Sequence, residues 1–365
     1  MQSVVVSSKV DEKSHGEPQT VPGQLTIPPF PYKRVFIDPE ELWVNTCTLD
    51  LVPIEVIEIP ENRDGWSPLP RGVEWGFGLD SQRQVLAFVT GNNCYNRINK
   101  LVDYFSEEAR MKANRKGCPS PYDFYHNNYP AILEKAKKDM EAYKQGVSSY
   151  PSPHGDHLEY WVREEIYLMN KECTTFKISV TKALMKFFGS QIVLDPSAGW
   201  GDRLLGSVAA GVKLYHGVDP NPRMRKAYDD MIAFTKKHNP QTVVNVTTED
   251  FLKIELQPES YDTVFTSPPY FDYEEYAPDP RQSISGRPTI GKWLHEFFLP
   301  YLRKAWNALV KGGHMIIYIS DTKTGKFCKP MLDYAKKELH GQYLGVIAMT
   351  NETRNWGYPI WVWRK

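Results

Sequence analysis

The second half of the chain repeats one pattern that strongly constrains its fold: short β-branched and aromatic runs alternate with stretches of helical periodicity. The expected strands are Gln191–Leu194, Tyr215–Val218, Val243–Val246, Tyr261–Phe265, His314–Ile319, Leu344–Met349 and Pro359–Trp363. The expected helices between them include Asp202–Ala210, Arg223–Thr235 and Trp293–Val310. This alternation is typical of a largely parallel sheet with helices on both faces. The last two strands have no helix between them, so we expect a hairpin that closes the sheet edge, and Gly312–Gly313 is expected to end the last helix.

The first half of the chain is organised differently. Residues 1–29 are polar and lack hydrophobic periodicity, which predicts a disordered tail. From Phe30, runs such as Val52–Ile59 and Val85–Thr90 predict a small β-rich unit. Helical periodicity follows, over about Tyr95–Lys116, Tyr129–Tyr143, Leu158–Lys171 and Val180–Phe188. We therefore predict a tail over residues 1–29, an α+β extension over residues 30–172, and a C-terminal α/β domain over residues 173–365.

Composition excludes several classes of protein. The 365 residues carry 44 Lys and Arg against 44 Asp and Glu, so a nucleic-acid partner would need a local basic face. The five cysteines are scattered and form no CxxC pair, which argues against a disulfide framework or a zinc cluster. No apolar run is long enough to span a bilayer, and the N-terminus lacks the apolar core of a signal peptide. We therefore expect an intracellular protein with no membrane partner.

The strongest local signal is Asp195–Arg203 (DPSAGWGDR), which directly follows an expected strand and precedes a helix. Ligands of doubly wound sheets bind at the carboxyl ends of strands, and the glycines of this loop allow a close approach of the backbone. Asp219 ends the next strand, where a carboxylate suits the hydroxyls of a ribose, and Asp250 and Phe251 follow the third strand, where they would hold and stack an adenine. Each feature alone also fits a tight connection or a helix N-cap. Together they predict a pocket for a nucleoside without a phosphate grip, which is the shape of S-adenosylmethionine.

A second signal, Thr266–Phe271 (TSPPYF), lies at the tip of the fourth strand, next to the first strand across the switch point. Two consecutive prolines fix the backbone and leave carbonyl oxygens without competing N–H groups. Oxygens of Ser267 and Pro268 would orient an amine toward a methyl donor, and Tyr270 would stack on a base taken out of its helix. The alternative is a Pro-Pro turn that only caps the strand.

The two motifs together resemble the amino-methyltransferases that modify N4 of cytosine or N6 of adenine, mostly in DNA. The resemblance covers about Cys173–Lys365, and Ser197 stands where that family commonly has Phe. It implies a Rossmann-like methyltransferase fold with a seven-stranded sheet, preceded here by the α+β extension, and S-adenosylmethionine as the cofactor. The TSPPY form is met most often in cytosine-N4 enzymes, which favours cytosine over adenine.

The motifs and the resemblance give the expected site. The cofactor-binding residues are Phe176, Asp195, Ser197, Ala198, Gly199, Gly201, Asp219, Asp250 and Phe251. The catalytic residues are Ser267, Pro268, Pro269 and Tyr270.

Substrate recognition is expected from Phe30–Ser190 and from the polar loop Phe271–Lys292, which suits a mobile lid. In that loop Arg281, Arg287 and Lys292 would contact phosphates, and Phe271 is a further expected substrate-binding residue; a solvated surface loop is the alternative. The basic stretch 97–116 is either a nucleic-acid stripe or an ordinary charged helix face. No metal is expected, because the chemistry requires none and the histidines of the HGDH segment are more often inert.

Three readings of function remain open. The first is methyl transfer to an exocyclic amine of a nucleic-acid base, with DNA as the expected partner. Related (N/D)PPY sites methylate an RNA adenine or a glutamine side-chain amide, which gives the second. The third is a degenerate, non-catalytic subunit that binds nucleic acid.

Overall fold

The computed structural model describes residues 26–61, 64–70, 73–80, 83–91, 93–147 and 157–365. The chain divides into a short unit, Met1–Phe30, and a compact unit, Pro31–Lys365. Most of the predicted tail, residues 1–25, lies outside the described residues, as does His154 of the HGDH segment. The boundary predicted between residues 172 and 173 stays a prediction.

The described strands of the compact unit include a sheet of nine, in the order β1-β2-β10-β11-β9-β7-β4-β5-β6. β3 and β8 pair separately with each other. The strands are β1 (Ile54–Glu58), β2 (Gln84–Val89), β3 (Asn114–Arg115), β4 (Ile192–Asp195), β5 (Leu214–Val218), β6 (Val243–Thr247), β7 (Tyr261–Thr266), β8 (Glu274–Glu275), β9 (Leu309–Tyr318), β10 (Gln342–Thr350) and β11 (Gly357–Arg364).

Seven of these strands, β10-β11-β9-β7-β4-β5-β6, form the predicted Rossmann-like sheet and confirm the fold class. β7, β4, β5 and β6 pair in parallel, and β11 runs antiparallel to both of its neighbours. The prediction that the hairpin of β10 and β11 closes the sheet edge is wrong. β2 adds in parallel to β10, and β1 is the outer strand. The edge of β10 offers unpaired backbone groups that the N-terminal strands satisfy, which a local pattern does not reveal.

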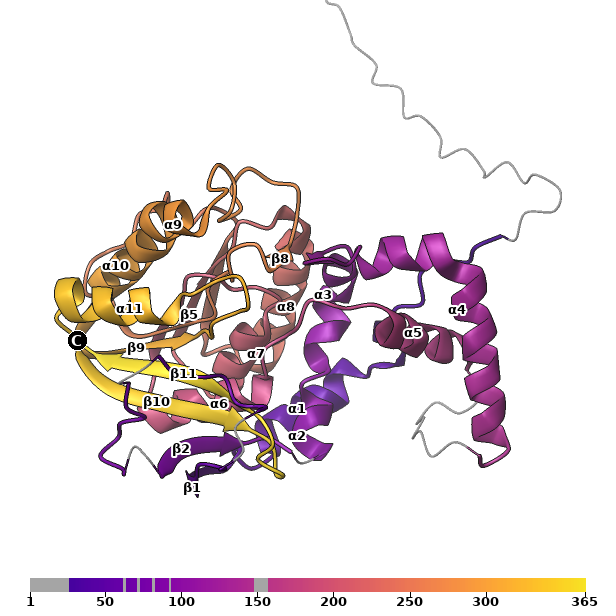
Figure 1. Cartoon of the computed structure of the whole chain (residues 1–365), viewed down its shortest axis with the longest axis horizontal. Helices are drawn as coiled ribbons and strands as arrows, with labels where there is room; N and C mark the ends of the chain where they lie inside the picture. The colour runs from indigo at the N-terminus through magenta and orange to yellow at the C-terminus, as the bar shows by residue number, and fades with distance from the viewer. Residues whose placement is uncertain (1–25, 62–63, 71–72, 81–82, 92, 148–156) are drawn as a thin grey trace, which may run out of the picture. The chain divides into compact units, whose positions relative to one another are not determined.

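Helices cover both faces of this sheet (Figure 1). They are α1 (Pro39–Thr48), α2 (Asn93–Ile98), α3 (Leu101–Met111), α4 (Pro121–Lys144), α5 (Leu158–Met169), α6 (Ile178–Phe188), α7 (Asp202–Ala209), α8 (Arg225–His238), α9 (Ile290–Trp293), α10 (Leu299–Ala308) and α11 (Cys328–Tyr334). Two 3₁₀ turns, Lys33–Phe36 and Pro222–Met224, and two π-helical turns, Leu294–Phe298 and Ala335–Leu339, complete the described elements.

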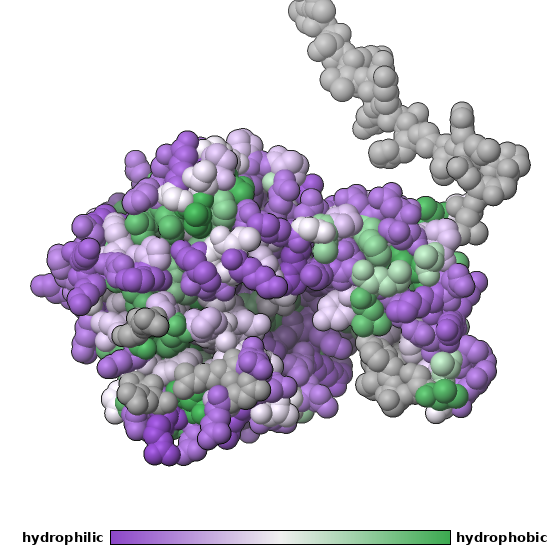
Figure 2. All heavy atoms as spheres, viewed as in Figure 1, coloured by the Kyte–Doolittle hydropathy of each residue, from purple (hydrophilic) through white to green (hydrophobic). Residues whose placement is uncertain are grey.

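Successive residues along each strand point into different cores, as the alternation of a strand requires. In β4, Val193 packs with α6, α7 and α8, whereas Leu194 packs with α10 and α11. The face in Figure 2 is mostly hydrophilic, with apolar residues showing between the polar ones. Burial of apolar side chains on both faces of the sheet therefore supplies the main stabilisation of this unit.

Two local predictions need correction. Helix α1 lies inside the region predicted to be β-rich, because Asp38 caps it: the Asp38 carboxylate accepts from the backbone N–H groups of Glu40 and Glu41. The pair Gly312–Gly313 lies within β9 and does not end a helix. α10 already ends at Ala308, and Gly312 adopts a positive φ of 80° where the pairing of β7 with β9 is irregular.

Candidate functional site

The loop between β4 and α7 turns sharply at its two glycines. Gly199 and Gly201 adopt φ values of 59° and 91°, a region that favours glycine. A Cβ on Gly201 would lie 2.3 Å from the Met231 sulfur. Ala198 donates its N–H to the carbonyl of Val218 at 2.9 Å, which fastens the loop to the end of β5.

Beneath this loop lies the first arginine cluster, which we define as Asp195, Asp202 and Arg203. The Asp195 carboxylate is fully buried and accepts from Arg203 Nε and from the Tyr215 hydroxyl, each at 2.8 Å. The guanidinium of Arg203 also contacts Asp202 at 3.4 Å and the carbonyl of Ser197. Burial raises the pKa of Asp202. The contacts of Arg203 with Asp195 and with the carbonyl of Ser197 stabilise the conformation of the loop between β4 and α7.

Asp219 directly follows β5 and binds the loop between β4 and α7. Its two oxygens accept from the backbone N–H groups of Gly199, at 2.8 Å, and Asn221, at 2.9 Å. Burial raises the pKa of Asp219 to about 6, although these two N–H groups lower it. A carboxylate has about four acceptor positions, so two remain for a ligand.

Asp250 and Phe251 follow β6 and line the same cavity as Asp219. One oxygen of Asp250 accepts from the N–H of Leu252 at 2.9 Å. The Phe251 ring lies 5.0 Å from the ring of Tyr301, and Lys304 Nζ lies 5.3 Å from its centroid. An aromatic face and an acidic group therefore lie together at the third strand end.

The tetrapeptide Ser267–Tyr270 follows β7, the parallel neighbour of β4. Ser267, Pro269 and Tyr270 line the cavity. The Tyr270 hydroxyl lies 3.5 Å from the carbonyl oxygen of Tyr318, and burial raises the pKa of Tyr270, so the phenol stays protonated at neutral pH.

Tyr301 joins the two motifs. Its hydroxyl lies 2.9 Å from Ser197 Oγ at the end of β4 and 3.1 Å from Thr266 Oγ1 at the end of β7. Tyr301 comes from α10, in a stretch that carries no motif, so only the packing of α10 on the sheet reveals its place. The bridge holds the two strand ends at a fixed separation.

A cavity of about 780 Å³ opens over these strand ends, and both motifs line it. The predicted residues that it brings together are Phe176, Ser197, Gly199, Asp219, Asp250, Phe251, Ser267, Pro269, Tyr270 and Arg281. Asp195, Ala198, Gly201 and Pro268 lie in or beneath the loops and are not among its lining residues. Phe176 packs 4.8 Å from the Tyr318 ring.

Of the three predicted substrate residues, only Arg281 lines the main cavity. Phe271 turns into the apolar core, with its ring 6.0 Å from that of Trp293, and does not line the main cavity. Arg287 stands over the Phe297 ring at 5.7 Å and also lies outside the cavity lining. Arg281 lines the cavity, but its guanidinium is held by the carboxylate of Asp279 at 2.9 Å.

Part of the cavity wall comes from segments without any motif. β3 pairs with β8, which places Arg115 opposite Glu274 in the predicted lid loop. The lining residues outside the motifs include Arg115, Lys116, Lys171, Tyr273, Tyr318, Lys323, Trp356 and Tyr358. Arg115 and Lys116 belong to the basic stretch 97–116 and Tyr273 to the polar loop, but no motif marks Tyr318, Lys323, Trp356 or Tyr358, because their place depends on how distant segments meet.

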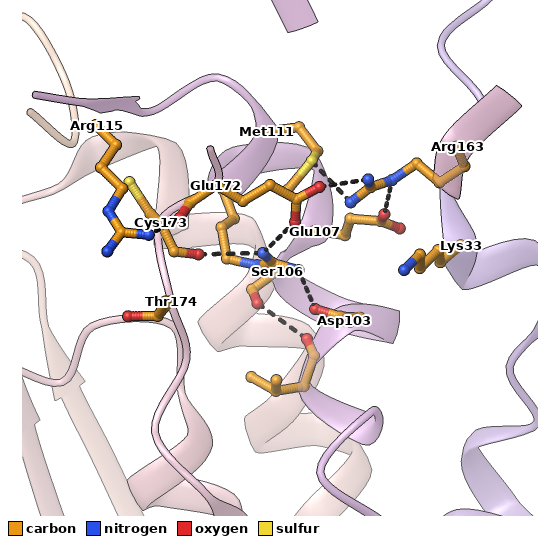
Figure 3. A network of polar contacts seen from close by, with 12 residues as sticks. Lys33, Asp103, Ser106, Glu107, Met111, Arg115, Arg163, Glu172, Cys173 and Thr174 are labelled. Atoms are coloured by element: carbon orange, nitrogen blue, oxygen red, sulfur yellow. Dashed lines mark hydrogen bonds and ion pairs between the residues drawn. The ribbon is translucent and has the colours of Figure 1, made fainter. Parts of the chain in front are cut away.

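The second arginine cluster lies behind this wall; we define it as Asp103, Glu107, Arg110, Arg163 and Glu172 (Figure 3). Arg163 Nε donates to Glu107 at 3.0 Å, and Arg110 Nη1 donates to Glu172 at 2.9 Å. Burial alone would raise the pKa of Glu172, but the guanidinium groups of Arg163 and Arg110 lower it to about 2. The basic stretch 97–116 is therefore not one continuous surface stripe, because Arg110 is buried within this cluster.

The second cluster continues toward the cavity. Arg110 also donates to the carbonyl of Cys173 at 3.2 Å, and Arg115 donates to the carbonyl of Glu172 at 3.2 Å. Figure 3 shows Arg163 and Arg115 on opposite sides of Glu172, which Cys173 and Thr174 follow in the chain. The cluster thus fixes the segment that enters the cavity wall at Thr174.

Two further properties concern only the described residues. They contain no group of three or more His, Cys, Asp or Glu side chains arranged to hold a metal ion. No helix among them is both long enough and apolar enough to cross a membrane.

No protein-family model matches this chain, and no curated protein matches it. Solved structures do. An S-adenosylmethionine-dependent methyltransferase from Mesorhizobium loti is 14% identical, with 51% of this chain and 96% of that chain covered and a TM-score of 0.34. The tRNA m1G37 methyltransferase of M. jannaschii is 14% identical, with 52% of this chain and 48% of that chain covered and a TM-score of 0.33. The chain therefore spans about half the length of that enzyme.

A third match is the cyclase SpnF, at 10% identity, with 53% of this chain and 84% of that chain covered and a TM-score of 0.36. Sequence identities this low say nothing about activity, and matches with TM-scores below 0.5 carry no conclusion about this chain. The fold class of this chain depends on its own sheet order, and its chemistry on its own cavity.

Proposed function

We propose that this protein transfers a methyl group from S-adenosylmethionine to the exocyclic amine of a nucleic-acid base, with N4 of cytosine or N6 of adenine in DNA as the target. The observation that carries the proposal is the single cavity shared by the strand ends of β4, β5 and β6 and by the tetrapeptide after β7. In a doubly wound sheet the switch point, here between β4 and β7, is where a ligand binds.

The cavity residues fit the cofactor. Asp219 keeps two acceptor positions for the ribose hydroxyls, and Asp250 with Phe251 offers an acidic group and an aromatic face to the adenine. The loop around Gly199 presents backbone to the middle of the ligand. When bound, S-adenosylmethionine supplies an electrophilic methyl group.

The residues of the chain contribute by orienting the target amine and the methyl donor relative to each other. The Ser267 hydroxyl accepts an N–H of the target amine, which directs the nitrogen lone pair toward the methyl donor. The protonated Tyr270 closes the same side of the cavity with its ring. Tyr301 holds the two strand ends together, so that donor and acceptor sites keep their separation. Fixed geometry of this kind is worth roughly 7–11 kcal/mol of a barrier in favourable cases.

The test is transfer of a labelled methyl group to duplex DNA, single-stranded DNA, RNA and protein. Nucleic acid should be labelled, and nucleoside analysis should give N4-methylcytosine or N6-methyladenine. Label found only in protein would overturn the proposal in favour of a side-chain amide, and label in no acceptor would favour a non-catalytic subunit.

One variant separates chemistry from cofactor binding. Ser267→Ala should lower turnover roughly 10- to 100-fold, because it loses one acceptor of the reacting amine. Its affinity for S-adenosylmethionine in calorimetry should stay within about twofold. Ser260→Ala, at a half-buried serine outside the cavity lining, is the matched control and should keep wild-type turnover. Wild-type turnover in Ser267→Ala would remove Ser267 from the reaction.

A further inference from the structure

Seven Lys and Arg residues line the cavity, although the whole chain has no net charge. Arg203 and Arg281 are paired with carboxylates and Lys177 contacts Asn96, which leaves Arg115, Lys116, Lys171 and Lys323. Arg115 and Lys116 come from β3 and the residue after it, Lys171 from the link after α5, and Lys323 from the loop after β9. We call these four residues the basic rim. Three of them belong to the part of the chain that the motifs do not explain.

The basic rim is only partly neutralised. Lys116 contacts the carboxylate of Asp272 and the Thr324 hydroxyl. Lys171 and Lys323 are both exposed and form no ion pair with any residue that the structure describes. Two ammonium groups at the mouth therefore remain available to an anionic ligand.

The acidic residues near the rim are already engaged. Glu274 accepts from the Tyr276 hydroxyl at 2.9 Å and from the N–H of Thr174 at 3.4 Å. Asp321 accepts from the N–H groups of Phe327 and Cys328, at 2.8 and 3.0 Å. Because the two carboxylates accept hydrogen bonds from the protein, their repulsion of an anion bound at the mouth of the cavity is weakened.

Arg115 of the rim is also held in place. Arg115 donates to the Tyr273 hydroxyl at 2.5 Å, lies over the Tyr273 ring at 5.0 Å, and donates to the carbonyl of Glu172. Lys171 directly precedes Glu172, which the second arginine cluster fixes (Figure 3). A charged group that is already ordered loses little entropy when it binds.

The cavity wall also carries many aromatic residues. Among them are Tyr270, Tyr273, Tyr318, Trp356 and Tyr358. A planar base can stack on such a wall whatever its sequence context.

We propose that the basic rim binds the phosphates of a single-stranded nucleic acid whose target base enters the cavity and stacks on its aromatic residues. This inference rests on the proposed function and names the form of its substrate. A chain with no net charge has little general affinity for a polyanion, so few contacts would offset the unpairing of a duplex base, which costs a few kcal/mol. A single strand has no such cost.

The test is the salt dependence of binding to a fluorescent single-stranded oligonucleotide. The two available ammonium groups of Lys171 and Lys323 predict a slope of log K against log salt of about −1.4, and contacts from all four rim residues would make it about −3. In the double variant Lys171→Gln/Lys323→Gln the slope should be shallower by about 1.4, and affinity at low salt should fall roughly 10-fold. The matched control is Lys213→Gln/Lys311→Gln, two exposed lysines near the amino ends of β5 and β9, which should leave both values unchanged.

An unchanged slope in the rim variant, tighter wild-type binding to duplex than to single strand, or equal binding to polyglutamate would each overturn this inference. The proposed function fails separately, since it requires methyl transfer to nucleic acid and the slope does not. Rim variants that lose transfer to an oligonucleotide but keep transfer to a free nucleoside would support both.

Discussion

The two buried arginine clusters differ in how the chain builds them. The first cluster takes its three members from a single strand-loop-helix segment, Asp195–Arg203. The second joins α3, α5 and the link before Thr174, which lie far apart in sequence. Both clusters bury charged side chains next to the cavity wall. Only the first can be recognised in the sequence, because its members belong to one contiguous motif.

The clusters also share their charges differently. In the first, one guanidinium serves two buried carboxylates; in the second, two guanidinium groups serve three. Removing one partner of a buried pair is costly because the other charge stays buried without compensation. The first cluster should therefore be the more fragile, and the second should tolerate single changes better.

The largest effect is expected for Arg203→Met. Asp195 and Asp202 would both lose their cation while fully buried, so the free energy of unfolding should fall by about 3–5 kcal/mol. Urea unfolding followed by circular dichroism measures this loss. Arg281→Met, which removes a partly exposed pair with Asp279, should cost at most about 1 kcal/mol. A similar small loss in both variants would end the contrast between the clusters.

The next effect concerns the turn above the first cluster. Gly201→Ala would place a Cβ 2.3 Å from the Met231 sulfur at a residue with a positive φ. The free energy of unfolding should fall by about 2–4 kcal/mol, and the affinity for S-adenosylmethionine should fall as well. Gly211→Ala is the matched control, since its φ of 78° is also positive but nothing lies near its Cβ. It should cost about 1–2 kcal/mol in the same unfolding assay. Equal losses would mean that Met231 moves aside freely.

Glu172→Gln tests the tolerance of the second cluster. Each arginine keeps one carboxylate, so the loss of stability at pH 7 should be about 2–3 kcal/mol. Because Arg163 and Arg110 lower the pKa of Glu172 from 4.5 to about 2, the wild type loses this contribution as the pH falls between those values. The difference between wild type and variant should therefore shrink from pH 4.5 toward pH 3. A constant difference would show that the charge of Glu172 is not what stabilises the cluster.

The smallest effect contrasts Glu172 with Asp219, a buried carboxylate that has backbone N–H groups as partners. Since burial raises the pKa of Asp219 to about 6, its ionised form is lost as the pH falls below that value. Affinity for S-adenosylmethionine should drop up to about 10-fold between pH 7 and pH 5 in calorimetry. Asp219→Asn should bind more weakly at pH 7 and show a flat profile. The same pH dependence in the variant would assign it to another group.

The sequence alone was sufficient for the α/β sheet and for the strand ends that line the cavity. The strand–helix alternation placed each of the seven expected strands within a few residues, and the motifs at Gly199, Asp219 and Ser267 all reached one cavity. Both results depend on local rules: the period of apolar residues determines the element, and the end of a parallel strand determines the side on which a loop emerges.

The tertiary structure alone decided the rest. The pairing of β3 with β8, the addition of β2 to β10 and the Tyr301 bridge join residues that are distant in sequence. In the folded chain Phe271 lies in the apolar core and Arg110 is buried among carboxylates, and neither position follows from the sequence. Such contacts depend on where whole elements pack, and short-range periodicity carries no information about the partner of an edge strand or of a charged side chain.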